Sequence, residues 1–267
     1  MSWGQVAAFA RRDGRIELSY HFQLVMRVFS TAFAVTTFYF LGRLVGDAPE
    51  VAQYRGQYFG FALVGLVVTS LGFTVMRKVS RVLVDEAAVG TLEILLVSNT
   101  SLAVLVGGAI VIPVALGLVD VLIYLALGSL FGNVAYSASS LLLAVPVLAL
   151  VLGTFVGWGL LAAAFVVLTK RGEPFSGLIG QATTLLAGSL FPVALLPDAL
   201  SWLTRLIPAF YGLRALRGLL LTDAAATAVI FDMFALVVWN AVLIPIGLLA
   251  VAKALRLSRR FGTVIDF

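Results

Sequence analysis

The chain has 267 residues, of which 61% are hydrophobic and 12% are charged, and its formal net charge is +5. A soluble domain is about 45–50% apolar and about 25% charged, and one core of this size cannot hide the apolar excess from water. The composition therefore excludes an ordinary soluble domain and predicts a protein that is embedded in lipid.

Residues 1–22 predict an amphipathic helix on the membrane surface. Apolar residues recur at helical spacing from Trp3 onwards, and three arginines follow between positions 11 and 15. Such a helix lies in the interface and buries its apolar face in the lipid. A frayed basic tail is the alternative interpretation of this segment. We treat residues 23–267 as one transmembrane domain.

Long charge-free stretches predict an all-α, polytopic membrane protein with six spans. About 20 apolar residues cross about 30 Å of hydrocarbon as a helix. The first span is long enough only if Arg27 and Arg43 snorkel to the interface at its two ends. The predicted spans are Gln23–Val45, Tyr58–Met76, Ala103–Leu130, Ser140–Thr169, Phe175–Leu195 and Asp232–Leu255.

The distribution of basic residues predicts the orientation. With six spans both termini share a side, and 13 of the 18 Lys and Arg residues would lie on that side. We expect the chain in the plasma membrane, and the positive-inside rule places both of its termini in the cytoplasm. Because basic residues flank spans for this topological reason, the positive charge does not indicate a nucleic-acid partner.

The polar segment 77–101 between the second and third spans is expected to be a cytoplasmic coupling loop. Its apolar residues recur at helical spacing around Glu86, with charges on the other faces. Gly90 is suited to end one helix, and the Thr91 hydroxyl is suited to cap the next. A short helix, a break and a second helix would form a docking surface for a soluble partner. A solvated connector is the alternative.

Two polar side chains inside the predicted spans are candidates for an intramembrane site. Asp120 is the only acid of the third span, and a charge at mid-bilayer costs about 2.5–3.5 kcal/mol on insertion scales. It would serve as a substrate contact or gating hydrogen bond, or as a structural bond to a neighbouring span. Gln181 in the fifth span is suited to hydrogen bonding across helices. Gly153 and Gly157 in the fourth span predict close helix packing.

The segment 191–221 is apolar but broken by prolines. Pro192, Pro197 and Pro208 each remove a helical hydrogen bond. Backbone that is not helical is tolerated at membrane depth only where protein or a water-filled cavity covers it. We interpret the segment as a short re-entrant hairpin followed by helices at the extracellular surface, with its three arginines near headgroup phosphates. Plain interfacial anchoring is the alternative.

The segments 77–101 and 191–221 resemble those of a known family, the membrane subunits of type-2 ATP-binding cassette exporters. Glu86 followed by Gly90-Thr91-Leu92-Glu93 is similar to the cytoplasmic E…GTLE signature of that family. The second segment is similar to its FP…LP…NP…Y…ALR region, and the matching residues are Phe191, Pro192, Pro197, Pro208, Tyr211 and Arg217. Both motifs occur in the family's order, and the resemblance covers most of the chain. Ile207 stands where the family usually has asparagine, which leaves the subfamily open.

The resemblance implies a permease without its own ATPase. Two six-span subunits, identical or closely related, would each contact a cytoplasmic ATPase through the amphipathic N terminus and the loop around Glu86–Glu93. ATP and Mg²⁺ would bind to the ATPase, and an amphipathic, drug-like or lipid-type substrate would move outward. The alternatives are a polysaccharide or teichoic-acid exporter of the same family and, from another class, a self-contained secondary transporter or channel.

The chain offers little for catalysis of its own. A P-loop needs Gly-Lys-Ser/Thr, and none of the three lysines at positions 78, 170 and 253 follows a glycine. The chain has no cysteine, and His21 is its only histidine, so it has no cysteine or multi-histidine metal site. We therefore expect no catalytic residue, no metal site and no cofactor bound by this chain.

Overall fold

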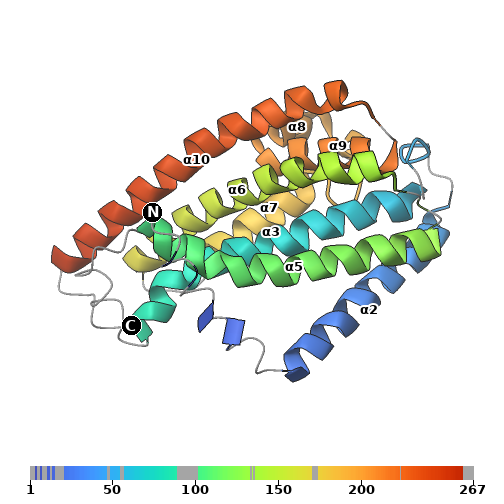
Figure 1. The fold of residues 1–267 in the computed structure, drawn as a ribbon. Coiled ribbons are helices and arrows are strands. Elements are labelled where there is room, and N and C mark those ends of the chain that lie inside the picture. The colour runs from blue at the N-terminus through green and yellow to red at the C-terminus, as the bar shows by residue number, and fades with distance from the viewer. Residues whose placement is uncertain are drawn as a thin grey trace.

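The computed structural model is a bundle of long helices (Figure 1). It describes residues 4, 7, 11, 12, 14, 15, 21–46, 49–54, 57–88, 102–132, 134, 136–169, 174–222 and 224–260. These residues form helices and turns, without a strand. The helices are α2 (His21–Val45), α3 (Gln57–Ala88), α5 (Leu102–Gly132), α6 (Ala138–Thr169), α7 (Pro174–Leu186), η1 (Val193–Leu195), α8 (Asp198–Ser201), η2 (Leu203–Leu206), α9 (Pro208–Leu221) and α10 (Ala226–Arg260).

Five helices of the described part are long and apolar enough to cross a membrane, namely α2, α3, α5, α6 and α10. The expected fifth span, Phe175–Leu195, is not confirmed as a continuous helix. α7 has 13 residues and ends at Leu186, so at 1.5 Å per residue it reaches only about 20 Å. Gly188 follows in the left-handed region with φ +68°, and this turn ends the helix within a charge-free stretch.

The expected second span is longer than predicted. α3 continues past Met76 to Ala88 without a break, so the first part of the expected coupling loop is an extension of a transmembrane helix. The rest of that loop, residues 89–101, lies outside the described residues, as do most of residues 1–20, where we expect the amphipathic helix.

α3 is the central helix of the bundle. In its most apolar stretch of 18 residues 78% are buried, against 11% in the corresponding stretch of α2 and 17% in that of α5. α5 and α6 pack beside it, α7 and α9 also contact it, and α2 leans away from the other helices (Figure 1). α3 therefore joins α2, α5, α6, α7 and α9, while α10 packs on α6 and α9.

α6 and α10 pack closely because glycines face α10. A Cβ on Gly157 would lie 2.6 Å from the Leu243 Cβ, so only glycine allows this approach. Nearby, the Asn240 side-chain amide donates to the Leu150 carbonyl over 2.9 Å. The expectation of close packing by the glycines of the fourth span fits this arrangement.

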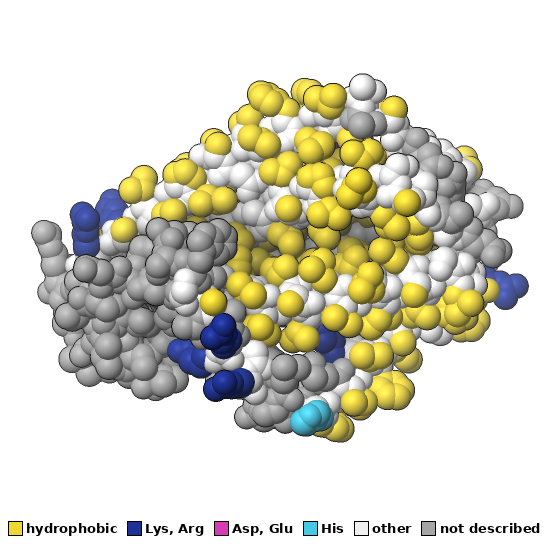
Figure 2. All heavy atoms as spheres, viewed as in Figure 1, with side chains coloured by type: hydrophobic (Ala, Val, Ile, Leu, Met, Phe, Trp, Pro, Cys, Tyr) yellow, Lys and Arg dark blue, Asp and Glu magenta, His cyan; other side chains and the backbone are white. Residues whose placement is uncertain are grey.

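The surface of the bundle is apolar. Figure 2 shows hydrophobic side chains over the middle of the face formed by α5, α6 and α10, and Lys and Arg side chains mostly toward its margins. Large apolar side chains such as Phe33 on α2, Leu122 on α5 and Leu249 on α10 are exposed. An apolar belt between basic ends is the surface that a lipid bilayer solvates.

Candidate functional site

The segment between α7 and α9 is a chain of short turns, and its prolines set where the turns begin. Pro192 directly precedes η1, Pro197 directly precedes α8, and Pro208 is the first residue of α9. A proline at these positions needs no backbone N–H donor and has the right φ for a helix start. Phe191 is half-buried beside Pro192. The broken backbone expected in this segment is thus present, in turns rather than in one hairpin.

Arg217 on α9 holds this break to the central helix. Its guanidinium donates to the Gly188 carbonyl over 2.9 Å and to the Ser189 carbonyl over 2.7 Å. It also donates to the Phe61 carbonyl of α3 over 3.2 and 3.3 Å. The last carbonyls of a helix and the turn after it have no partner within the helix. Arg217 therefore takes the place of that missing partner for the residues after α7.

The sequence interpretation of Arg217 as a residue near headgroups does not fit its position. The side chain is 5% exposed, and its guanidinium carbon lies 3.4 Å from the centroid of the Phe61 ring. Its hydrogen-bond partners are backbone carbonyls, so it contributes positive charge to the interior of the bundle. A buried guanidinium whose three nitrogens all donate hydrogen bonds favours a single arrangement of the helices around it.

Gly65 on α3 allows the central helix to approach the turn after α7. A Cβ at this position would overlap the Ser189 carbonyl oxygen, so α3 approaches the break through a gap that only glycine leaves. The sequence alone did not identify Phe61, Gly65 or Ser189 as parts of this region, because Ser189 lies more than 100 residues along the chain from the other two.

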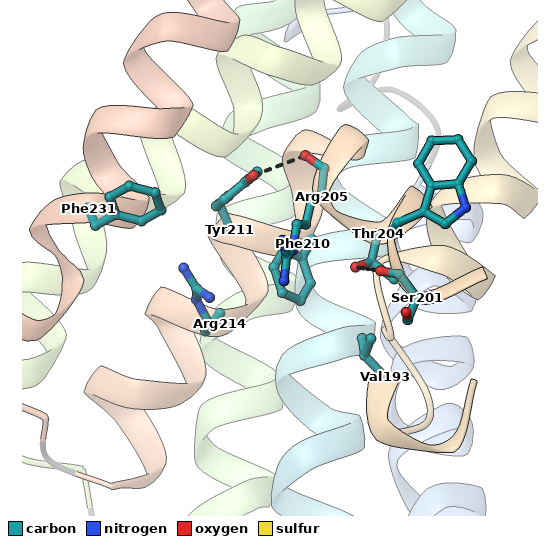
Figure 3. Close-up of a pocket in the computed structure, with 9 residues that line it drawn as sticks. Val193, Ser201, Thr204, Arg205, Phe210, Tyr211, Arg214 and Phe231 are labelled. Atoms are coloured by element: carbon teal, nitrogen blue, oxygen red, sulfur yellow. Dashed lines mark hydrogen bonds between the residues drawn. The ribbon is translucent and has the colours of Figure 1, made fainter. Parts of the chain in front are cut away.

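A cavity of about 540 Å³ is lined by residues of the broken segment, of α9 and of the first turns of α10. We call it the α9 cavity, and Figure 3 shows its side chains. It is lined by Val193, Ser201, Trp202, Thr204, Arg205, Phe210, Tyr211, Arg214 and Phe231.

The walls of the α9 cavity are fixed by polar contacts. The Tyr211 hydroxyl donates to the Arg205 carbonyl over 3.0 Å and ties α9 to η2 (Figure 3). Arg214 forms a two-pronged ion pair with Asp232 at the start of α10, and its guanidinium lies over the rings of Phe210 and Tyr211. The carboxylate is buried and the arginine is half exposed. α9 and α10 are thus joined at this end of the bundle.

Asp120 on α5 pairs with Arg27 on α2, and both side chains are part-buried. The Arg27 Nε donates to one carboxylate oxygen over 2.8 Å, its Nη2 lies 2.6 Å from the same oxygen, and the Thr31 hydroxyl lies 3.4 Å from the other. This is the structural bond to a neighbouring span that we considered for Asp120. The expectation that Arg27 snorkels to the interface does not fit this contact, because the Asp120 carboxylate pairs with the Arg27 guanidinium.

The remaining predicted residues lie apart from one another. Gln181 is exposed on α7, on the outside of the bundle. Glu86 lies in the last turn of α3, while Gly90, Thr91, Leu92 and Glu93 fall outside the described residues. The structure therefore brings together the residues of the second motif and leaves the first motif at the far end of α3.

A second cavity, of about 420 Å³, lies between α3, α5, α6 and α9. Its lining consists of leucine, valine and alanine side chains, from buried Leu63 and Leu216 to exposed Leu122 and Val145 at its rim. Such a lining offers an apolar ligand contacts but no polar group for orientation.

Comparison with known proteins gives one match over most of the chain. A family model described as ABC-2 type transporter matches residues 5–221. That range includes four of the five long helices, the segment around Glu86 and the broken segment up to the end of α9. No curated protein sequence matches the chain.

Proposed function

The chain belongs to the ABC-2 type transporter family, and we propose that it is the permease subunit of an exporter driven by a separate ATPase. The observation that carries the proposal is the family match over residues 5–221, since it covers four of the five long helices together with the segment expected to contact the ATPase. The direction of transport, the cargo and the composition of the complex are parts of the proposal.

The central helix supports a mechanical route from the ATPase to the spans. α3 runs without interruption from Gln57 to Ala88, and Glu86 lies in its last turn. About 32 Å away along the same helix, at 1.5 Å per residue, Gly65 and Phe61 contact the break after α7 and the guanidinium of Arg217. A displacement of the Glu86 end would therefore reach α7 and α9 through one rigid element.

The partners follow from this route. We propose that two copies of this chain, or this chain and a close paralogue, pair in the membrane. A cytoplasmic ATPase pair would contact the loop around Glu86–Glu93 and the N-terminal segment, and it would bind ATP and Mg²⁺. Both termini would then be cytoplasmic, and the broken segment with the α9 cavity would face the outside.

The second cavity, between α3, α5, α6 and α9, favours an amphipathic or lipid-type cargo over a glycan. Its lining has no polar side chain, whereas a polysaccharide would leave its hydroxyl groups without partners there. A lipid-linked glycan, whose lipid part alone would enter the apolar cavity, is the second candidate within the family.

A self-contained secondary transporter or channel has less support. Such proteins use ionisable relays within their spans. In the five long helices of the described part, the carboxylates inside the membrane-spanning stretches are Asp120 and Asp232. Each of them forms an ion pair with an arginine, which leaves neither free to carry protons or cations.

Co-purification with the ATPase tests the proposal. The tagged chain should retain an ABC ATPase, and proteoliposomes with both should move a fluorescent lipid in an ATP-dependent manner. Reversing two charges, Glu86→Lys with Glu93→Lys, should release the ATPase. Glu50→Lys, an exposed position beyond the end of α2, is the matched control and should retain it. An isolated chain that conducts ions without ATP would contradict the proposal.

A further inference from the structure

The α9 cavity lies at the depth of lipid headgroups. The 20 residues Met233–Ala252 of α10 carry no charge, and as a helix they cross about 30 Å, the thickness of the hydrocarbon core. Phe231, which lines the cavity, and Asp232, which pairs with the cavity residue Arg214, come directly before this stretch. Trp202 is exposed at the rim, as is typical of aromatic residues at membrane interfaces.

The cavity carries one positive charge in excess. Arg205 and Arg214 both line it, and Asp232 neutralises Arg214. Arg205 is exposed, and within the part of the chain that the structure describes no carboxylate pairs with it. Figure 3 shows Arg205 extending from η2 alongside Phe210, toward the side on which Arg214 lies. The net charge is thus suited to a ligand with a single negative charge.

Arg205 also remains as a donor for a ligand, together with the indole N–H of the exposed Trp202. The hydroxyl donors of the cavity are already used within the protein: the Tyr211 hydroxyl donates to the Arg205 carbonyl, the Ser201 hydroxyl to the Asp198 carbonyl, and the Thr204 hydroxyl to the Ser201 carbonyl. Their oxygens are left as acceptors. An anion that also carries hydroxyl groups would use the guanidinium and these acceptors together.

We propose that the α9 cavity binds the phosphate ester of an anionic ligand at the membrane surface, with Arg205 as the group that holds the phosphate. A guanidinium matches two phosphate oxygens at once. The volume of about 540 Å³ lies within the range of small-molecule sites. The ligand is a phospholipid headgroup such as phosphatidylglycerol, or a free phosphate ester. The proposed phosphate site depends only on the location of the α9 cavity at a membrane surface. Its assignment to the outer leaflet rests on the proposed function.

Fluorescence quenching in lipid nanodiscs tests the site without any transport assay. Trp202 lines the cavity, and brominated lipids quench a tryptophan that they contact. The intact chain should be quenched more strongly by brominated phosphatidylglycerol than by brominated phosphatidylcholine at equal content. The excess should disappear in Trp202→Phe, because Trp158 and Trp239, the other tryptophans that the structure describes, do not line the cavity.

Two variants assign the effect to Arg205. Arg205→Gln should weaken the preference for phosphatidylglycerol roughly tenfold, since a charge-assisted hydrogen bond is lost, and Arg205→Lys should retain part of it. Arg43→Gln removes the same charge from the exposed end of α2, outside the α9 cavity, and should leave the preference unchanged. Thermal unfolding of each variant shows that it is folded.

Competition then identifies the source of the phosphate. Displacement of the brominated lipid by short-chain phosphatidylglycerol alone assigns the site to headgroups, and displacement by inorganic phosphate as well assigns it to free phosphate esters. Equal quenching by both brominated lipids, or equal effects of Arg205→Gln and Arg43→Gln, would overturn the proposal. Loss of ATP-driven transport with unchanged lipid preference would bear on the proposed function and not on this site.

Discussion

The guanidinium carbon of Arg217 on α9 lies 3.4 Å from the centroid of the Phe61 ring on α3, and the same guanidinium donates to the Phe61 carbonyl. Two helices that are 156 residues apart at these positions are thus joined by a cation–π contact and by hydrogen bonds at one point. Since the other donors of Arg217 satisfy the carbonyls after α7, this point also fixes where the broken segment meets the central helix.

Replacing Arg217 should destabilise the bundle strongly. Arg217→Met leaves the carbonyls of Phe61, Gly188 and Ser189 without their donor, and we expect a loss of roughly 3–5 kcal/mol. Arg217→Lys keeps the charge but not the fork of donors, so it should recover only part of the stability. The midpoint of thermal unfolding in detergent measures the change. Arg43→Gln is the matched control, and a midpoint as high in Arg217→Met as in this control would contradict the assigned role.

Gly65→Ala should separate α3 from the segment after α7. The added Cβ overlaps the Ser189 carbonyl oxygen, and neither helix nor backbone turn yields at low cost. We expect a lower unfolding midpoint and slower ATP-driven transport. Gly107→Ala on α5, where a Cβ meets nothing within 4 Å, should be neutral or slightly stabilising because alanine favours a helix over glycine. The idea fails if both substitutions behave alike.

A double-mutant cycle should reveal the Arg27–Asp120 pair. Asp120→Asn leaves the part-buried Arg27 charge without its carboxylate, and Arg27→Gln leaves the part-buried Asp120 carboxylate without its guanidinium. Each single change should lower the unfolding midpoint by roughly 6–12 °C. The double variant, which is neutral at both positions, should unfold at a higher temperature than either single variant. Additive losses in the double variant would show that the two residues are not coupled.

Labelling of single cysteines should show which end of the bundle is outside. The chain has no cysteine of its own, so one added thiol is the only target for a membrane-impermeant maleimide. In intact cells Gln53→Cys, in the exposed connection between α2 and α3, should be labelled. Lys253→Cys, exposed near the other end of α10, should react only after the membrane is opened. The reverse pattern would overturn the proposed cytoplasmic location of the coupling segment.

Much of the fold could be predicted from the sequence because it depends on local runs of apolar residues. A stretch such as Ser140–Thr169 has no charge and is long enough to cross the hydrocarbon, so the environment alone makes it a helix. The order of the two motifs and the positions of Pro192, Pro197 and Pro208 are equally local features. The resemblance to ABC transporter permeases, which the family match confirms, rested on these features.

Only the tertiary structure decided which distant groups meet. The charge-free stretch that begins at Phe175 looks like a span, yet its helix stops at Leu186, since the carbonyls beyond it find their donor in Arg217 from α9. Arg27 looks like an interfacial anchor, yet α5 places Asp120 beside it. A run of apolar residues predicts each helix separately from the others. A buried charge is stable only where another element supplies a partner, and the local sequence does not indicate which element that is.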